Sequence, residues 1–452
     1  MLDKKLRDEI IALIKCQVVP AIGCTEPMAV ALCVARATEL LGQTPERIEA
    51  RLSANILKNA MGVGIPGTGM VGLPIAIALG ALIGRSAYGL EVLRDCTPEA
   101  VERGKQYLAE NRIDVNLKKD TAEKLYIEVH ATAAGHTATA IIAHSHTNFI
   151  HTALDEPQTP GTEQTANAVE PTNAHQPSNC STSQSLPPSR GESEGGFGDS
   201  PLTLRTVWDF ATTTPLDEIS FILEARRLNE EAAQKALEGH YGHELGKVLS
   251  RPLGRGIMGE SIFSHILSST SCACDARMAG AMIPVMSNSG SGNQGICATN
   301  PVVVFAEENH NTEDELIRAL TLSHLTAIYI KQSLGTLSAL CGCVVASTGS
   351  SCGITYLMGG GYTEVCAAVK NMIANLTGMI CDGAKPSCAL KLTTGVSTAV
   401  LSAILAMQQK CVTSVEGIID DDVDRSIHNL TSIGKDAMNE TDRMVLDIMT
   451  SK

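Results

Sequence analysis

The chain has 452 residues, of which 44% are hydrophobic but only 3% aromatic, and a formal net charge of −14. This length predicts two or three structural units, and a core of Ala, Val, Ile, Leu and Met favours closely packed helices. The sequence has no run rich in Lys and Arg, so we expect neither a nucleic-acid partner nor binding to an anionic membrane surface.

The N-terminal stretch predicts an amphipathic helix rather than a secretory signal, because charged residues interrupt the apolar run of MLDKKLRDEIIALIKCQVVP. We therefore expect a cytoplasmic protein. The helical pattern breaks from Pro20 to Gly23 and resumes in TEPMAVALCVARATELL, where Thr25 is a suitable N-cap. Cys24 is thus expected just ahead of a helix N-terminus.

The segment from Ala60 to Gly84 is apolar enough to suggest a membrane span, but prolines and glycines interrupt it before a full span can form. We expect a buried loop and a core helix here, and no membrane partner. The same region begins with KNAMGVGIPGTG, in which Asn59 and Thr68 are candidate contacts for the substrate. Glycines needed only for packing would give the same pattern, so the loop alone is not decisive.

Residues 96–150 predict a helix followed by strands, because KLYIEVHATAAGHTATAIIAHSHTNFIHTA alternates around an Ala-Gly turn. Two or three antiparallel strands are expected. The histidines of this stretch could suggest a metal site. His144 and His146, however, alternate with Ser145 as residues of one strand face would, which favours a structural role.

A segment rich in Pro, Ser, Thr and Gly, residues 153–200, is predicted to be disordered because it cannot bury enough apolar surface to offset its chain entropy. The stretch LTLRTVWDFATTT that follows could return to the sheet. PLDEISFILEARRLNEEAAQKALEGH then predicts a helix, and from about residue 240 helical patterns dominate. We therefore predict an α+β fold in which residues 1–90 and 225–452 form a mainly helical domain and residues 91–224 form an inserted small unit with an antiparallel sheet.

The stretch SNSGSGNQG places Gly290, Gly292 and Gly295 at the GxGxxG spacing. A dinucleotide site also needs a preceding strand and a parallel sheet, which the surrounding sequence does not predict. Two interpretations stay open: a tight turn between helices, and a loop whose backbone N–H groups bind a carboxylate. In the second, Ser291 and Asn293 would contact the substrate.

Fifteen cysteines, an odd number, predict reduced thiols in a chain without an export signal. Cys381 and Cys388 bracket a loop in ICDGAKPSCALK, and Cys341 lies forty residues upstream in ALCGCVVAS. Three thiolates on loops could bind an iron–sulfur cluster or zinc, although the paired C-x-x-C ligands typical of zinc are missing. The residues alone support a three-cysteine cluster and scattered buried thiols about equally.

Four motifs, AIGCTEP, KNAMGVGIPGTG, SGSGNQG and CDGAKPSCALK, resemble in this order the bacterial and archaeal L-cysteine desulfidase family, which is related to the α-domain of iron–sulfur L-serine dehydratases. The likeness spans nearly the whole chain. It implies a [4Fe–4S] cluster bound by Cys341, Cys381 and Cys388, with Cys343 as the neighbour that could replace Cys341. It also implies that Cys24 is the catalytic acid/base of a lyase converting L-cysteine to hydrogen sulfide, ammonia and pyruvate.

A cluster with three protein ligands would leave one iron open as a Lewis acid. Cys24 as a base would need a lowered pKa, which a helix N-terminus favours. Lys385 or Lys58 would pair with the substrate carboxylate, and neither these lysines nor Lys391 has a context that indicates a Schiff base.

Two alternative functions stay open. The first is dehydration of L-serine on the same cluster, which differs from cysteine desulfidation only in the leaving atom. The second is a non-catalytic sensor that binds a metal and an amino acid at the same site. In each case the partner is a small amino acid, and the sequence is compatible with a homodimer.

Overall fold

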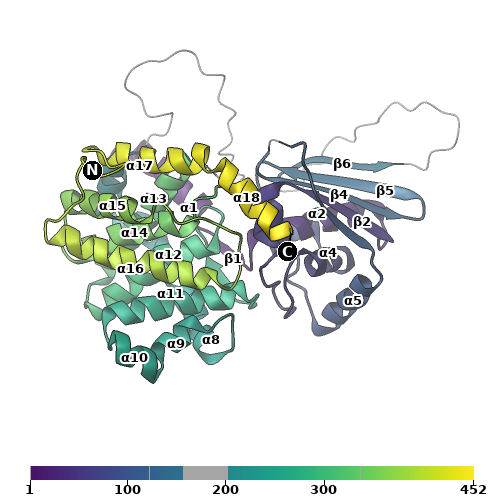
Figure 1. Ribbon diagram of the computed structural model, residues 1–452, viewed down its shortest axis with the longest axis horizontal. Helices are drawn as coiled ribbons and strands as arrows, with labels where there is room; N and C mark the ends of the chain where they lie inside the picture. Colours follow the sequence, from purple (N-terminus) through teal and green to yellow (C-terminus); the bar gives the residue numbers. More distant parts are fainter. Residues whose placement is uncertain (1, 122, 156–201, 336, 452) are drawn as a thin grey trace, which may run out of the picture. The chain divides into compact units, whose positions relative to one another are not determined.

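The computed structural model describes residues 2–121, 123–155, 202–335 and 337–451 and shows the expected mainly helical α+β fold (Figure 1). It contains two compact units. The helical unit comprises Met1–Pro27, Leu57–Gly72 and Leu202–Lys452, and the sheet unit comprises Met28–Ile56 and Leu73–Pro201.

This division differs from a single insertion at 91–224, because the chain enters the sheet unit twice. The segment expected to be disordered, 153–200, lies outside the described residues except for its first three residues, which belong to a strand.

The sheet unit contains five strands in the order β3-β2-β4-β5-β6. The β2–β3 pair is parallel and the other pairs are antiparallel, so the sheet is mixed and not purely antiparallel as expected. Strand β2 was not predicted, because residues 47–52 fall in the segment 1–90 that was assigned to the helical domain. The strands are β2 (Arg47–Leu52), β3 (Ile113–Leu117), β4 (Tyr126–Ala133), β5 (His136–Ala143) and β6 (Phe149–Asp155).

Helices pack closely on this sheet. The Cys33 Sγ on α2 (Thr25–Leu41) lies 3.2 Å from the Ala140 carbonyl oxygen of β5. A Cβ on Gly80 would lie 2.7 Å from the Ala31 carbonyl oxygen, so only glycine lets α4 approach α2 this closely. Besides α2, the sheet unit contains α4 (Leu73–Leu82), η1 (Ser86–Glu91) and α5 (Pro98–Ala109).

The expected strand position of His144 is wrong. Strand β5 ends at Ala143, and His144 has a φ of 69°, a left-handed conformation that belongs to the turn before β6. Its imidazole lies 3.3 Å from the carboxylate of Glu123. The two histidines therefore do not alternate along a strand face.

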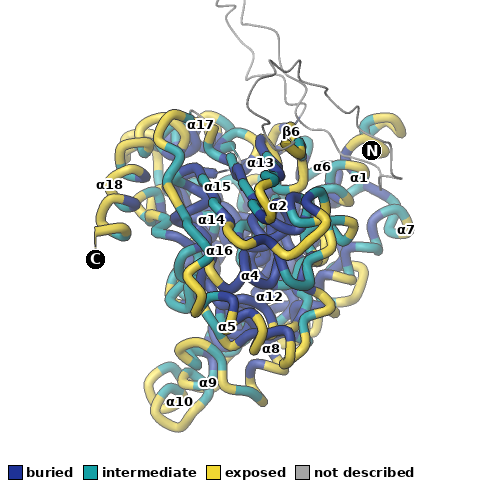
Figure 2. Tube along the Cα trace, turned by 90° about the vertical axis from the view of Figure 1, so that its right-hand side faces the viewer, coloured by how far each residue is buried: buried dark blue, intermediate teal, exposed yellow. Residues whose placement is uncertain are grey.

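The helical unit is built around long helices that are buried on most sides, as the dark-blue tubes of α12 and α14 show in Figure 2. A Cβ on Gly349 would lie 2.2 Å from the Ser323 carbonyl oxygen, so glycine allows α14 to contact α13 closely. The central helices are α11 (Ile262–Met278), α12 (Gly292–Glu308), α13 (Glu313–Leu334), α14 (Gly342–Leu357), α15 (Tyr362–Leu376) and α16 (Cys388–Met407).

The remaining elements surround this core. Strands β1 (Pro20–Ile22) and β7 (Pro284–Met286) form a small antiparallel pair. The helices are α1 (Lys4–Gln17), α3 (Ala54–Ala60), α6 (Leu204–Thr213), α7 (Leu216–Ile219), η2 (Ser220–Ile222), α8 (Leu223–Glu238), α9 (Leu245–Ser250), α10 (Pro252–Met258), α17 (Val423–Ser432), η3 (Ile433–Ala437) and α18 (Asn439–Thr450).

The interpretation of LTLRTVWDFATTT as a returning strand is wrong, because these residues form α6. Thr203 caps the helix by accepting a hydrogen bond from the Thr206 N–H. Leu204, Val207 and Phe210 recur at helical spacing and are fully buried in the core of the helical unit. Burial of this face outweighs the β propensity of the Thr, Val, Trp and Phe residues.

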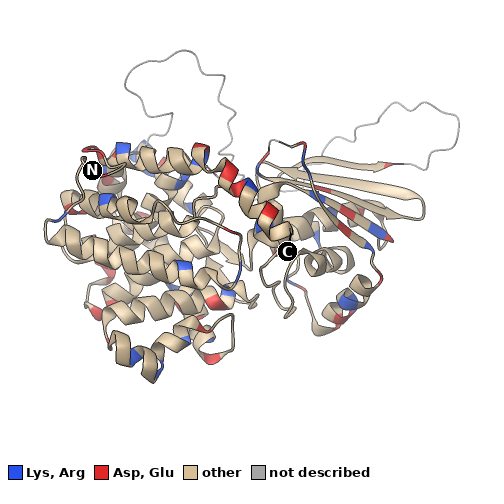
Figure 3. Cartoon of the chain, viewed as in Figure 1, with Lys and Arg blue, Asp and Glu red and all other residues tan. Residues whose placement is uncertain are grey.

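Helix α16 is long and apolar enough to cross a membrane by length and composition. It carries a single charged residue, Lys391, and its ribbon is mostly tan in Figure 3. Half of its most apolar stretch is nevertheless buried inside the protein. The helix packs against α11, α14 and α15. A buried core helix can have the same length and apolar composition, so these two properties are weak evidence for a membrane span.

Candidate functional site

The AIGCTEP segment lies against the SNSGSGNQG loop in the helical unit. Pairing of β1 with β7 brings the two segments together, and the Thr25 hydroxyl donates a hydrogen bond of 2.9 Å to the Gly290 carbonyl oxygen. Helix α2 begins at Thr25, so Cys24 directly precedes it. Gly23 has a φ of 70°, and a Cβ there would lie 2.3 Å from Cγ of Pro66, so this turn requires glycine.

Cys24 is buried, with 3% of its surface exposed, and forms a hydrogen-bonded array with Glu26 and Asn59. The Cys24 thiol donates to Glu26 Oε2 at 3.0 Å, and the Asn59 side-chain amide donates to Glu26 Oε1 at 2.9 Å. Both oxygens of one carboxylate are thereby oriented, one toward the thiol and one toward the amide.

The expected lowering of the Cys24 pKa is wrong. Burial raises the pKa of Cys24 well above its usual value, and the negative charge of Glu26 raises it further, while Arg277 opposes the shift. Burial and the carboxylate therefore outweigh the effect of the α2 N-terminus. Cys24 rests as a protonated thiol whose hydrogen-bond acceptor is a carboxylate.

The glycine-rich loop of residues 61–70 packs through its backbone on the end of α11. The Gly64 N–H donates to the Met278 carbonyl at 2.9 Å, and the Gly67 N–H donates to the Gly280 carbonyl at 3.1 Å. The Thr68 hydroxyl closes this loop on itself, since it donates to the Ile65 carbonyl at 2.8 Å and accepts from the Met70 N–H. Thr68 thus has a role within the loop, whereas Asn59 belongs to the Cys24 array.

The second glycine-rich stretch forms the turn between β7 and α12. Ser291 caps α12 by accepting from the Gln294 N–H, and Asn293 lies in the first turn, where its Oδ1 accepts from Arg277 at 3.0 Å. Buried hydrogen bonds support this turn: the Asn288 side chain bonds the His324 imidazole, and the same imidazole bonds the Thr299 hydroxyl. Burial lowers the pKa of His324 to about 3, so its imidazole is neutral in this chain.

Cys341 and Cys381 are brought together by a short bridge between two backbone segments, Leu340 and Ile380. The Cys341 N–H donates to the Met379 carbonyl at 2.9 Å, and the Cys381 N–H donates to the Ala339 carbonyl at 2.6 Å. Cys388 begins α16. Burial raises the pKa of both Cys381 and Cys388, and the charge of Cys341 contributes to each shift, which places the three thiols in one region.

Cys341 and Cys343 differ in environment although their Sγ atoms are 3.4 Å apart. The hydrogen bond with Cys343 lowers the pKa of Cys341, whereas the same bond together with burial raises the pKa of Cys343. Cys343 also lies 3.1 Å from the Met379 sulfur and 3.4 Å from the Lys391 carbonyl oxygen. Of the two neighbours, Cys341 therefore forms a thiolate more readily than Cys343.

The donor chemistry of Cys341, Cys381 and Cys388 is the soft thiolate type that binds iron–sulfur clusters or zinc. Within the described residues, no three His, Cys, Asp or Glu side chains are placed to hold one metal ion. The three cysteines are soft donors on loops and helix starts, and Lys391 contributes positive charge next to Cys341.

The lysines considered for the substrate carboxylate have carboxylate partners in the protein. Lys385 lies 2.6 Å from Asp382, and Lys391 pairs with the same aspartate. Lys58 is buried against Asp442 and donates to the Cys381 carbonyl at 3.3 Å. These lysines therefore hold the cysteine loop in shape, which lowers their availability for a substrate.

Comparison with known proteins identifies the family. The family described as "Serine dehydratase alpha chain" matches residues 87–447. The chain belongs to the serine dehydratase alpha-chain family. Among its relatives, the UPF0597 protein of Bacteroides thetaiotaomicron is 68% identical over 446 residues, covering 99% of this chain and 98% of that protein. The UPF0597 protein of Oleidesulfovibrio alaskensis is 46% identical over 443 residues, covering 98% of this chain and 97% of that protein.

Membership of the serine dehydratase alpha-chain family points to a lyase of the dehydratase type, and the family is associated with iron–sulfur serine dehydratases. The matched residues include the candidate ligands Cys341, Cys381 and Cys388. Cys24 and Asn59 precede the matched residues, but the UPF0597 relatives align with nearly the full length of the chain.

Sequence reasoning missed three polar residues of the candidate site, namely Glu26, Arg277 and Gln294. Glu26 follows Cys24 by two residues in a motif that was already singled out. Arg277 is the only basic residue of CACDARMAGAM, and a charge in such an apolar run was a usable signal. Gln294 had no local signal beyond its place in the glycine-rich motif.

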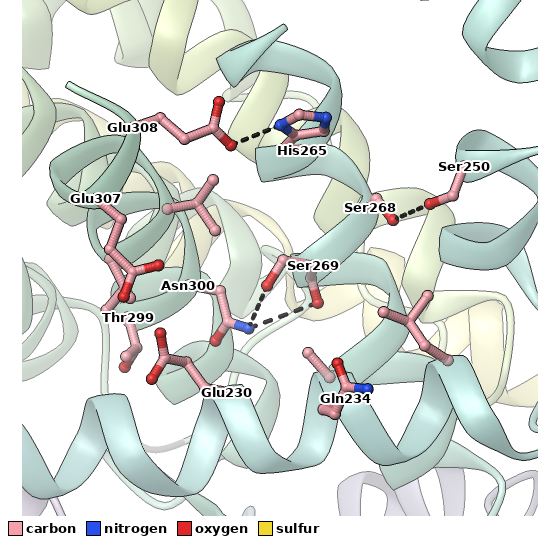
Figure 4. A pocket seen from close by; sticks show the side chains of 14 residues that line it. Glu230, Gln234, Ser250, His265, Ser268, Ser269, Thr299, Asn300, Glu307 and Glu308 are labelled. Atoms are coloured by element: carbon pink, nitrogen blue, oxygen red, sulfur yellow. Dashed lines mark hydrogen bonds and ion pairs between the residues drawn. The ribbon is translucent and has the colours of Figure 1, made fainter. Parts of the chain in front are cut away.

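A cavity of about 390 Å³ lies elsewhere in the helical unit, between α8, α11 and α12 (Figure 4). Glu230, Glu307 and Glu308 make its lining acidic. Burial and the neighbouring Glu307 raise the pKa of Glu230, while His265 bonds Glu308. None of the site residues predicted for this serine dehydratase alpha-chain protein lines the cavity.

Proposed function

We propose that the protein is an iron–sulfur-dependent β-elimination lyase that converts L-cysteine to hydrogen sulfide, ammonia and pyruvate in the cytoplasm. The observation that carries the proposal is the hydrogen-bonded array of Cys24, Glu26 and Asn59, which lies in the same compact unit as Cys341, Cys381 and Cys388. A thiol–carboxylate pair can move a proton, and three thiolates can hold a cluster.

Proton transfer in this proposal begins at the resting array. Glu26 Oε2 takes the proton of the Cys24 thiol, and the thiolate then removes the α-proton of the substrate. The electron pair of the Cα–H bond forms the Cα–Cβ double bond, and the leaving group departs with the electrons of the C–S bond. The proton held by the array is then available to the departing sulfide. The resulting enamine tautomerises and hydrolyses to pyruvate and ammonia.

The surroundings of the array support this role. Asn59 fixes the Glu26 carboxylate, so the thiol and its acceptor stay in one geometry. Burial of Cys24 keeps water away from the thiolate once it forms, which preserves its basicity. Cys341, Cys381 and Cys388 would hold a [4Fe–4S] cluster, which when bound supplies a Lewis-acidic iron that stabilises negative charge on the substrate.

Dehydration of L-serine is the second candidate, because the matching family is described as a serine dehydratase alpha chain. The two reactions need the same α-proton transfer and differ only in the atom that leaves Cβ. A sensor that binds an amino acid without turnover would use the same residues. A homodimer and the lack of nucleic-acid and membrane partners remain part of the proposal.

The deciding experiment is anaerobic purification followed by iron and acid-labile sulfide analysis and by separate assays with L-cysteine and L-serine. About four irons per chain with sulfide and pyruvate formed from L-cysteine would support the proposal. Pyruvate from L-serine with no sulfide from L-cysteine would favour the dehydratase. Cluster present without turnover of either amino acid would favour the sensor, and a chain without iron would contradict all iron–sulfur functions.

A further inference from the structure

Arg277 is a buried cation with no carboxylate partner in the part of the chain that the structure describes. It lies near the end of α11 with 3% of its surface exposed. Across residues 2–121, 123–155, 202–335 and 337–451, its guanidinium forms no ion pair; Nη1 donates to Asn293 Oδ1 at 3.0 Å, and Nε has no acceptor. Burying a charge without a counter-charge is costly. An anionic ligand at this guanidinium would complete its hydrogen bonding.

The start of α12 lies directly against this guanidinium. A Cβ on Gly292 would lie 2.2 Å from Arg277 Nε, so glycine at this position makes room for the arginine. Helix α12 has 17 residues, and its N-terminal N–H groups and dipole also favour an anion. Two independent features, the buried guanidinium and the helix N-terminus, therefore point to the same negative group.

Two buried amide oxygens in the same unit lack donors. Asn59 Oδ1 and Gln294 Oε1 have no hydrogen-bond partner among the described residues. Asn59 belongs to the Cys24 array, and Gln294 contacts the start of α14, since a Cβ on Gly342 would lie 3.0 Å from its Cδ. Both oxygens are acceptors suited to an ammonium group. An anion site and free acceptors together match a zwitterionic α-amino acid.

The position of Arg277 also fits the proposed proton transfer. Its charge acts on Cys24, where it opposes the rise of the thiol pKa. The Thr25–Gly290 hydrogen bond connects the residue after Cys24 to the turn before α12, and Gly292 of α12 lies against Arg277. The α-carbon is one bond from the carboxylate, so a carboxylate held by Arg277 would carry the α-proton into the region of the Cys24 array. The guanidinium would also stabilise the charge that spreads into the carboxylate when that proton leaves.

We propose that Arg277 binds the α-carboxylate of the amino acid substrate, with the N-terminus of α12 beside it and with Asn59 and Gln294 accepting hydrogen bonds from the α-ammonium. This assignment rests on the proposed function for the identity of the ligand. It replaces Lys58 and Lys385 as carboxylate partners, since both already face an aspartate.

The test measures binding of L-alanine, which has no leaving group, and of L-alaninamide, which has no carboxylate, by calorimetry on the anaerobically purified full chain. We expect the wild type to bind L-alanine at least about 10-fold more tightly than L-alaninamide, as the loss of a charged hydrogen bond predicts. Arg277→Met should abolish this preference, and Arg277→Lys should retain part of it. Arg318→Met is the matched control, because the Arg318 guanidinium donates to the carbonyls of Ala211 and Thr214, away from the residues of the proposed site.

Equal binding of the two probes by the wild type would overturn the assignment. Unchanged L-alanine binding by a folded Arg277→Met, or by Arg277→Lys if the methionine variant does not fold, would also overturn it. Failure of the proposed function gives a different result: Arg277-dependent binding of L-alanine without turnover of L-cysteine or L-serine. In that case the carboxylate site stands and the lyase proposal falls.

Discussion

The Cys24 thiol donates a 3.0 Å hydrogen bond to Glu26 Oε2, so the sulfur and the carboxylate form one proton-sharing pair. The pair matters because burial and this carboxylate both raise the pKa of Cys24. A thiol with a raised pKa stays protonated near neutral pH and needs an acceptor before it can act as a base. Glu26 is that acceptor, and Asn59 fixes its orientation.

Glu26→Gln should reduce turnover by about 10²- to 10⁴-fold, the range expected when a positioned proton acceptor is lost. Iron content should not change, because Glu26 is not one of the proposed cluster ligands. Removal of the negative charge also lowers the pKa of Cys24, so alkylation of Cys24 by iodoacetamide should begin at a lower pH than in the wild type. Steady-state kinetics and peptide mass spectrometry measure the two effects.

Glu218→Gln is the control for this variant, because Glu218 pairs with Arg7 outside the site. It should leave both turnover and the alkylation profile unchanged. Wild-type turnover in Glu26→Gln would show that Cys24 does not pass its proton to this carboxylate.

Single replacement of Cys341, Cys381 or Cys388 by Ser should remove most of the iron and acid-labile sulfide from anaerobically purified protein. Cys343→Ser should retain both, because the raised pKa of Cys343 disfavours the thiolate that a ligand must supply. The measurement is iron and sulfide per chain together with the visible absorption of the cluster. Cys411→Ser, at an exposed cysteine, is the control.

The variant Cys343→Ser carries the discriminating result. Loss of iron from Cys343→Ser, with iron retained in Cys341→Ser, would show that Cys343 and not Cys341 is the ligand. Iron retained in all four variants would contradict a cluster at this loop.

Local patterns were sufficient to predict those helices and strands whose buried residues and boundary residues are close together in the sequence. The break before α2 and the position of Cys24 followed from Pro20 and Gly23. The expected N-cap role of Thr25 is wrong, because Thr25 is the first residue of α2 and its hydroxyl donates to the Gly290 carbonyl. The strand pattern of β4 and β5 was similarly local. The mainly helical α+β fold was therefore predictable, whereas α6 was not, because burial of Leu204, Val207 and Phe210 decides its conformation.

The chemistry of the site depended on tertiary contacts that no local pattern contains. The pKa of Cys24 is set by burial and by the direction of the Glu26 side chain, so the helix N-terminus alone predicted the wrong sign. From the sequence, Lys58 and Lys385 were candidates for binding the substrate carboxylate. In the structure they form ion pairs with Asp442 and Asp382, respectively. Arg277 became a candidate only from the structure, in which it is buried without an ion pair to any described residue.

Glu128 should make the sheet unit sensitive to acid. Although burial would raise the pKa of Glu128, hydrogen bonds from His130, Lys118 and Tyr126 lower it to about 2. A carboxyl whose folded pKa is depressed stabilises the fold above its unfolded pKa, near 4.5, and this contribution is lost as the pH falls toward 2. Glu128→Gln should therefore lower the free energy of unfolding at pH 7 by roughly 3 kcal/mol.

The Glu128→Gln variant should also lose less stability than the wild type between about pH 5 and pH 2. Urea unfolding at several pH values measures both effects. Glu102→Gln, at an exposed glutamate, is the control and should follow the wild-type curve. Parallel acid curves for Glu128→Gln and wild type would show that this carboxylate is not the source of acid sensitivity.

The buried pair of Lys58 and Asp442 should stabilise the helical unit and the cysteine loop together. Lys58 is 1% exposed, pairs with Asp442 on α18, and donates to the Cys381 carbonyl at 3.3 Å. Lys58→Met removes the cation that neutralises a mostly buried carboxylate, so the free energy of unfolding should fall by about 3–5 kcal/mol. Iron retention should fall as well, because the Cys381 loop loses a contact.

The double variant Lys58→Met/Asp442→Leu should recover much of this stability, since two apolar side chains leave no buried charge. Lys105→Met, which breaks the exposed pair with Glu102, should cost less than about 1 kcal/mol and serves as the control. Urea unfolding gives the stabilities, and iron analysis reports on the loop. A double variant as unstable as Lys58→Met would show that packing around Lys58, and not the charge left on Asp442, determines the loss.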